Sequence, residues 1–96
     1  MMNVMKNLEI GMNITAYKSQ CIGFIIDNVN YSGKIIKVNK KSIRVQLEHI
    51  VVKHGDKITH DADYAATITY KFWKTTSDGR DIYVSDGRIY GIIEIA

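Results

Sequence analysis

Two identical turn motifs near the end of the chain constrain its fold more than any other feature. The tetrapeptide Ser-Asp-Gly-Arg occupies residues 77–80 and recurs at residues 85–88. Asp-Gly between runs rich in Ile, Val, Tyr, Thr and Phe favours a β-hairpin, because glycine accepts the positive φ that a tight reversal requires. The repeat therefore predicts three consecutive antiparallel strands, over residues 65–75, 80–84 and 88–95.

The length of each turn decides which side chains face the core. A two-residue first loop would place Trp73 opposite Val84, whereas a three-residue loop over 77–79 places Phe72 there. We favour the three-residue loop, because it gathers apolar side chains on one face: Ile68, Tyr70, Phe72, Ile82 and Val84. For the second copy we predict a two-residue turn, which pairs Val84 with Ile89 and Tyr83 with Tyr90.

The other face of these three strands is predicted to be aromatic and basic. It collects Thr67, Thr69, Lys71, Trp73, Tyr83, Arg88 and Tyr90. Nucleic-acid bases stack on flat aromatic side chains while cations contact phosphate, and protein interfaces also favour Trp, Tyr and Arg. Cross-strand packing pairs are a third explanation of the aromatic residues. The sequence leaves these three interpretations open.

Length and composition predict one all-β domain spanning residues 1–96, with residues 1–7 expected to fray. The chain has 96 residues, of which 46% are hydrophobic. Its net charge is only +3, but the charge is unevenly distributed. Residues 31–57 hold seven basic and two acidic side chains, a net +5. A local basic surface of this kind attracts polyanions.

A hairpin with a basic tip is predicted inside this basic third, with arms at 33–38 and 42–47. Ile36 and Val38 are expected to face the core together with Ile43, Val45 and Leu47. The side chains expected to face away are Ile35, Lys37, Arg44 and Gln46. Lys40 and Lys41 lie in the tip and, with Lys37 and Arg44, are candidates for phosphate contact. A solvated Lys-rich turn that discourages edge-to-edge pairing explains them equally well.

The segments 8–14, 33–38 and 42–45 together resemble the opening half of an SH3-like small barrel of the KOW or Tudor type. The resemblance covers about residues 8–47 and includes an entry turn or bulge at Gly11. It implies a small barrel or a strongly bent antiparallel sheet that ends in the C-terminal meander. It also implies a binding module rather than a catalyst. The segment at 18–32 and the long meander depart from that pattern.

No catalytic or metal-ligating pattern emerges, so neither an enzyme nor a cofactor is expected. His49, His54 and His60 lie near Asp56, Asp61 and Asp63, but their spacing matches no ligand motif. The single Cys21 excludes an intramolecular disulfide and suits a reducing cytoplasm. No apolar run reaches the roughly 20 residues that a membrane-spanning helix needs.

The sequence therefore predicts a non-enzymatic binding module. The first hypothesis is contact with nucleic acid or a nucleoprotein through Lys37, Lys40, Lys41, Arg44, Lys71, Trp73, Tyr83, Arg88 and Tyr90. The alternative is a protein-binding inhibitor or adaptor, encoded by a phage or mobile element, that blocks a larger host protein. A homodimer closed through the aromatic faces is a third hypothesis. The Lys-, Ile- and Asn-rich composition suggests a bacterial or phage genome.

Overall fold

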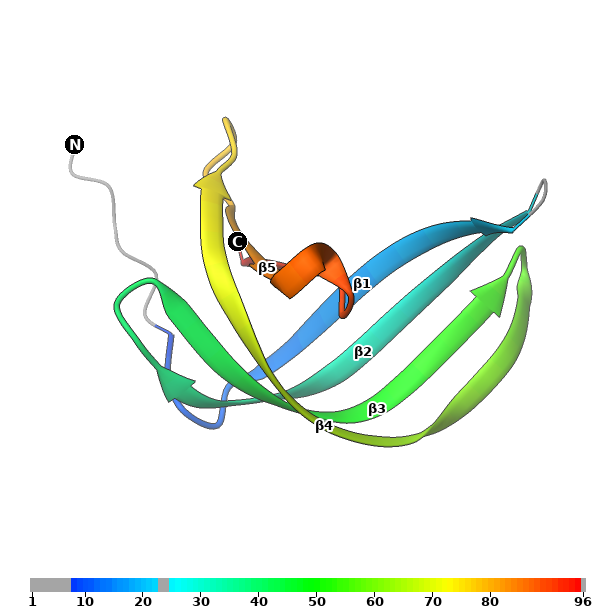
Figure 1. Cartoon of the computed structure of the whole chain (residues 1–96), viewed down its shortest axis with the longest axis horizontal. Coiled ribbons are helices and arrows are strands. Elements are labelled where there is room, and N and C mark those ends of the chain that lie inside the picture. The colour runs from blue at the N-terminus through cyan, green and yellow to red at the C-terminus, as the bar shows by residue number, and fades with distance from the viewer. Residues whose placement is uncertain (1–7, 23–24, 96) are drawn as a thin grey trace.

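The computed structural model describes residues 8–22 and 25–95, with the backbone alone for residues 20–22, 25 and 88. The protein is all-β, and in the described residues six strands form one antiparallel sheet (Figure 1). The strands are β1 (Asn13–Ile22), β2 (Ile25–Val38), β3 (Ser42–His54), β4 (Lys57–Thr75), β5 (Asp81–Ser85) and β6 (Ile92–Ile95), and a short 3-10 turn, η1, spans Asp86–Arg88. Within these described ranges, no helix is long and apolar enough to cross a membrane.

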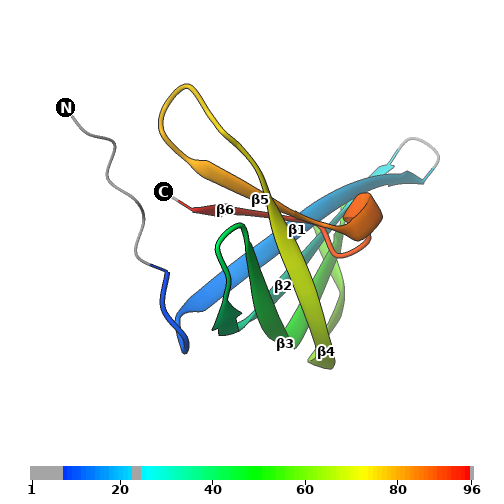
Figure 2. The same cartoon turned by 60° about the vertical axis from the view of Figure 1, so that its left-hand side comes forward.

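The strands follow chain order around a closed barrel, as Figure 2 shows. The barrel closes through a short seam, in which Ala16 pairs with Ile93 and Tyr17 with Ile92. By contrast, β2, β3 and β4 contain 14, 13 and 19 residues. The β1–β2 and β3–β4 hairpins extend well beyond the seam, and the sheet is strongly bent (Figure 1). The barrel is therefore closed only at the end where β1 pairs with β6.

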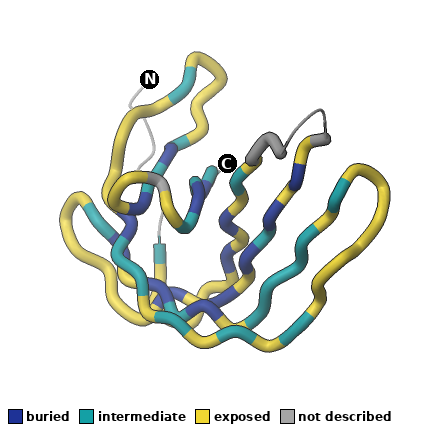
Figure 3. The backbone as a smooth tube through the Cα atoms, turned by 45° about the vertical axis from the view of Figure 1, so that its right-hand side comes forward, coloured by how far each residue is buried: buried dark blue, intermediate teal, exposed yellow. Residues whose placement is uncertain are grey.

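The core lies between the two sides of the barrel, where the buried residues gather in Figure 3. It consists of Ile14, Ala16, Val29, Tyr31, Ile35, Ile43, Val45, Leu47, Tyr70 and Ile93. Gly33 permits the closest backbone approach in this region. A Cβ atom on Gly33 would lie 2.1 Å from the carbonyl oxygen of Gln46, so a side chain there would push β2 and β3 apart.

The first Ser-Asp-Gly-Arg motif forms the predicted three-residue loop. Gly79 has a φ of 89°, and the Thr76 amide donates to the Arg80 carbonyl oxygen over 2.8 Å. The pairing predicted beyond this loop is wrong, because the register shifts between Phe72 and Lys74. Phe72 consequently pairs with Tyr83 instead of Val84, and it is 39% exposed rather than part of the core.

The two-residue turn predicted for the second motif is wrong. Val84 pairs with Ile92 and Tyr83 with Ile93, so the loop spans residues 86–91. The Ser85 hydroxyl oxygen accepts a hydrogen bond from the Tyr90 amide at 3.0 Å, which stabilises the longer loop. Gly91 then turns the chain into β6 with a φ of 81°. Identical tetrapeptides do make different turns, although the second differs from the form expected.

The basic hairpin forms as predicted, but Ile35, Ile36 and Val38 in its first arm do not face the sides that the sequence predicted. The register shifts between Ile35 and Lys37, so Ile36 is the extra residue. Ile35 is therefore fully buried, whereas Ile36 and Val38 are 42% and 39% exposed. At the chain entry, Gly11 has a φ of 93° in a turn that precedes β1. Lys37 faces outward, as the sequence predicted.

Candidate functional site

Cations from three adjacent strands lie on the outer face of the sheet at its closed end. Lys37 on β2 is the direct neighbour of Arg44 on β3, which in turn lies opposite Thr69 on β4. In the next row, Ser42 on β3 lies opposite Lys71 on β4. Lys37, Arg44 and Lys71 are all exposed. Antiparallel pairing thus brings together three cations that are 7 to 34 positions apart in the sequence.

The hairpin tip adds two more cations beside this row. The Asn39 amide donates to the carbonyl oxygen of Ser42 over 2.8 Å, which closes the tip and leaves Lys40 and Lys41 exposed. The carbonyl oxygen of Lys41 accepts a hydrogen bond from the Phe72 amide at 2.8 Å. This bond fixes the tip against β4 immediately beside Lys71.

Lys34 belongs to the same surface, although the sequence did not single it out. In a regular strand, residues three apart face opposite sides. The extra residue at Ile36 breaks that alternation, so Lys34 and Lys37 both face outward and are exposed. A bulge of this kind leaves no mark in an alternating pattern. We call the six cations Lys34, Lys37, Lys40, Lys41, Arg44 and Lys71 the basic face.

The charge of the basic face is not compensated within the described residues. None of the six cations forms an ion pair there, and residues 33–47 and 64–77 contain no Asp or Glu. Like charges directly opposite each other, such as Lys37 and Arg44, destabilise a sheet. The arrangement therefore costs the fold stability in the absence of a bound anion.

Trp73 lies at one end of the basic face. It occupies the register shift between Phe72 and Lys74, and its side chain is 46% exposed. The Lys74 ammonium lies 4.3 Å from the centre of the Trp73 ring, within the range of a cation–π interaction. The predicted exposure of Trp73 is confirmed, and Lys74 adds a cation beside it.

Tyr83 and Tyr90 lie apart from the basic face, so the predicted outer position of these two residues is wrong. Both are partly buried and pack against the core. The Tyr83 ring lies 5.6 Å from the Phe72 ring. Tyr90 lies 5.7 Å from Tyr31 and 6.5 Å from Tyr64, measured between ring centres. The register shift at Trp73 pairs Tyr83 with Phe72, and the longer second loop shifts β6 and removes Tyr90 from the sheet.

Arg88, the last predicted site residue, is placed by its backbone in η1, and its side chain lies outside the described atoms.

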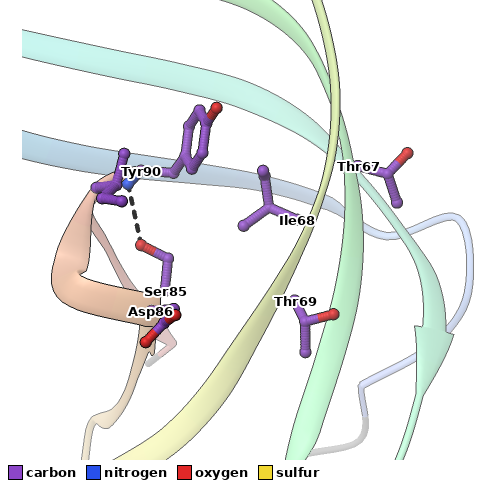
Figure 4. A pocket seen from close by; sticks show the side chains of 7 residues that line it. Thr67, Ile68, Thr69, Ser85, Asp86 and Tyr90 are labelled. Atoms are coloured by element: carbon purple, nitrogen blue, oxygen red, sulfur yellow. Dashed lines mark hydrogen bonds between the residues drawn. The ribbon is translucent and has the colours of Figure 1, made fainter.

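A pocket of about 240 Å³ lies next to η1, between it and β4. The residues that line it are Thr67, Ile68, Thr69, Ser85, Asp86, Ile89 and Tyr90. In Figure 4, Ile68 points from β4 towards Tyr90, whereas Thr67 and Thr69 point away from it.

The histidine and aspartate side chains of the middle segment form separate pairs. His54 Nδ1 bonds to the buried carboxylate of Asp27. On the outer face, His49 Nε2 lies 2.6 Å from Asp61 Oδ1, and its Nδ1 lies 3.6 Å from Asp63 Oδ1. Among the residues that the structure describes, no group of three or more His, Cys, Asp or Glu side chains could hold a metal ion.

Comparison with known proteins finds no matching family model, no matching curated protein and no matching solved structure. The resemblance to SH3-like barrels stays a prediction.

Proposed function

We propose that this protein is a non-enzymatic binding module that contacts nucleic acid, free or within a nucleoprotein, through the basic face. The observation that carries the proposal is the direct juxtaposition of Lys37 and Arg44, with Lys34, Lys71 and the tip lysines around them. A polyanion relieves the mutual repulsion of these cations when it binds. The counterions that it releases supply most of the binding free energy.

The expected binding is largely independent of base sequence. Lysines dominate the basic face, and an ammonium group contacts phosphate as a point charge rather than reading a base edge. Trp73 offers a surface on which one unpaired base can stack. A cytoplasmic location, where nucleic acid is abundant, fits this role. The alternative role as a protein-binding inhibitor or adaptor rests on a different part of the molecule, the edge of β4 over residues 57–69 that lies opposite β3.

A salt titration of a fluorescent 20-nucleotide oligothymidine tests the phosphate contacts. We expect the affinity to fall linearly with salt concentration on a log–log scale, with a slope of at most roughly 4 for six cations on a single strand. The double substitution Lys37→Glu/Arg44→Glu should weaken binding at least tenfold. Lys53→Glu/Lys57→Glu is the matched control, because it changes net charge equally at exposed positions of the distal hairpin.

Two results would contradict the proposal. One is the absence of binding at 50 mM salt. The other is an equal loss of affinity in both double variants, which would indicate attraction by net charge alone rather than by the basic face.

Trp73→Ala separates stacking from phosphate contact. Stacking of one base contributes about 1–3 kcal/mol, so this variant should bind the single strand roughly 5- to 150-fold more weakly. Duplex DNA of the same length has no unpaired base to offer, and its affinity should stay within about twofold. An equal loss for both ligands would refute a stacking role and leave Trp73 with a structural one.

A further inference from the structure

The long edge of β4 is open to another strand along most of its length. On one side β4 pairs with β3 from Lys57 to Lys71. On the other side, within the described chain, it pairs with β5 only from Tyr70 to Thr75. Residues 57–69 therefore present backbone amide and carbonyl groups that no described strand contacts. We call these residues the free edge.

The free edge lacks most devices that protect exposed strands from pairing. Such edges are usually protected by proline, lysine, bulges or very short strands. The chain contains no proline, and no Lys or Arg lies between residues 58 and 70. From residue 61 to residue 68 the side chains alternate regularly between exposed and partly buried. The pairing with β3 shifts register between Asp63 and Ala66 and again between Ile58 and His60, so bulges are present. The alternation from residue 61 to residue 68 nevertheless leaves this portion of β4 a template for an added strand.

The chemistry of the edge differs between its two faces. The outward side chains include Asp61 and Asp63, which contact His49 and are still 57% and 106% exposed. The inward side chains are Ala62, Tyr64, Ala66 and Ile68, which are partly buried. A strand that pairs here places alternate side chains beside the carboxylates and beside the apolar row. Basic and apolar residues in alternation are the complement.

The far end of the free edge is closed by β5 and by the loop around η1. Ser85 pairs with Tyr70, which blocks the path beyond Thr69. The pocket of about 240 Å³ beside Ile68 and Tyr90 lies at this closed end and has room for one apolar side chain (Figure 4). A second copy of the 19-residue β4, centred on residues 61–68, would run into β5. A short extended segment ends before it.

We propose that the free edge of β4 docks an extended segment of another protein, about eight residues long, in which apolar and basic residues alternate. The segment adds a strand to the sheet by backbone hydrogen bonds, and alternate side chains select it. Its basic side chains lie beside Asp61 and Asp63, and a terminal apolar side chain fills the pocket. This site is separate from the basic face, and neither proposal depends on the other.

The test uses synthetic eight-residue peptides measured by fluorescence anisotropy at low salt. An alternating Val-Lys peptide should bind at least tenfold more tightly than an alternating Val-Glu peptide. Methylation of every backbone nitrogen of the Val-Lys peptide should abolish binding, because it removes the donors that a paired strand requires. Amide hydrogen exchange of residues 61–69 should slow when the peptide is bound.

Asp61→Lys/Asp63→Lys should reverse the preference, so that the Val-Glu peptide binds more tightly than the Val-Lys peptide. Failed folding cannot produce such a reversal. Glu9→Lys/Asp78→Lys has the same net charge change at exposed positions outside β4, before β1 and in the first Ser-Asp-Gly-Arg loop, and should keep the original preference. An unchanged preference in the first variant, or undiminished binding of the methylated peptide, would overturn the proposal. The proposal would also be overturned if the protein were a dimer whose 61–69 amides exchanged slowly without any peptide. In that case a second copy of the chain would occupy the free edge.

Discussion

At the scale of single residues, Tyr70 shows how a polar group is accommodated in the core. Its side chain is fully buried, and its hydroxyl group donates a hydrogen bond to the Tyr90 carbonyl oxygen at 2.7 Å. Burial raises the pKa of the Tyr70 hydroxyl above its usual value. Tyr70 therefore links the inner face of β4 to the loop that precedes β6.

We expect Tyr70→Phe to lower the free energy of unfolding by about 1–3 kcal/mol, because it leaves the partly buried Tyr90 carbonyl oxygen without its donor. Urea denaturation measures the change. Tyr17→Phe is the control, since Tyr17 is 40% exposed and water replaces its hydroxyl contacts. Equal costs for the two substitutions would show that the Tyr70 hydrogen bond does not stabilise the fold.

Residue by residue, the alternating pattern predicted the buried side only where the strands are regular. It placed Ile43, Val45, Leu47 and Tyr70 in the core correctly. It failed at Ile36 and Phe72, where an extra residue shifts the register. Such a shift depends on how two strands meet, and neither strand alone records it.

At the scale of elements, β6 depends on a glycine that passes close to β1. Gly91 has a φ of 81°, and a Cβ atom on it would lie 2.3 Å from the Tyr17 carbonyl oxygen. Gly79 has a similar φ of 89°, but nothing lies within 4 Å of its Cβ position. A substitution at Gly79 would therefore cause backbone strain alone, whereas a substitution at Gly91 would cause backbone strain and a steric clash with β1.

Gly79→Ala should cost about 1–3 kcal/mol, the usual strain of a left-handed non-glycine residue. Gly91→Ala should cost clearly more, because the added methyl group also displaces β6 from β1. Thermal denaturation gives the two costs, and faster amide exchange in β6 should accompany the second substitution alone. Similar costs would mean that the Gly91 loop relaxes without disturbing the seam.

The elements of the candidate site were predictable to different degrees. The basic hairpin followed from alternation and a polar tip, so Lys37, Lys40, Lys41 and Arg44 were found from sequence. The second Ser-Asp-Gly-Arg turn was not, because the Ser85 hydroxyl group stabilises a longer loop than the Asp-Gly pair suggests. That loop alone decides whether Tyr90 faces outward or joins the core.

At the scale of the whole molecule, five tyrosines make stability sensitive to alkaline pH. A hydrogen bond with Tyr90, together with burial, raises the pKa of Tyr64 to about 12. Burial also raises the pKa of Tyr17, Tyr31, Tyr70 and Tyr83. In the unfolded chain a tyrosine ionises near pH 10, roughly two pH units below Tyr64 in the fold.

Folding therefore favours the neutral tyrosines, and their contribution is complete below about pH 10. It should be lost as the pH rises from about 10 to 12. The urea midpoint, measured at half-unit steps of pH, should be level up to about pH 10 and fall above it. Tyr64→Phe should reduce the steepness of this fall. An equally steep fall in that variant would rule out Tyr64 as a contributor.

The short seam between β1 and β6 also orders the events of folding. Each hairpin from β1 to β4 joins neighbours in sequence, whereas the seam joins Ala16 to Ile93, 77 positions apart. Contacts between distant positions form late, because closing a long loop costs entropy before any contact repays it. The curved four-stranded sheet should thus assemble first and the barrel close last. Weakening the seam should then speed unfolding while leaving the folding rate nearly unchanged.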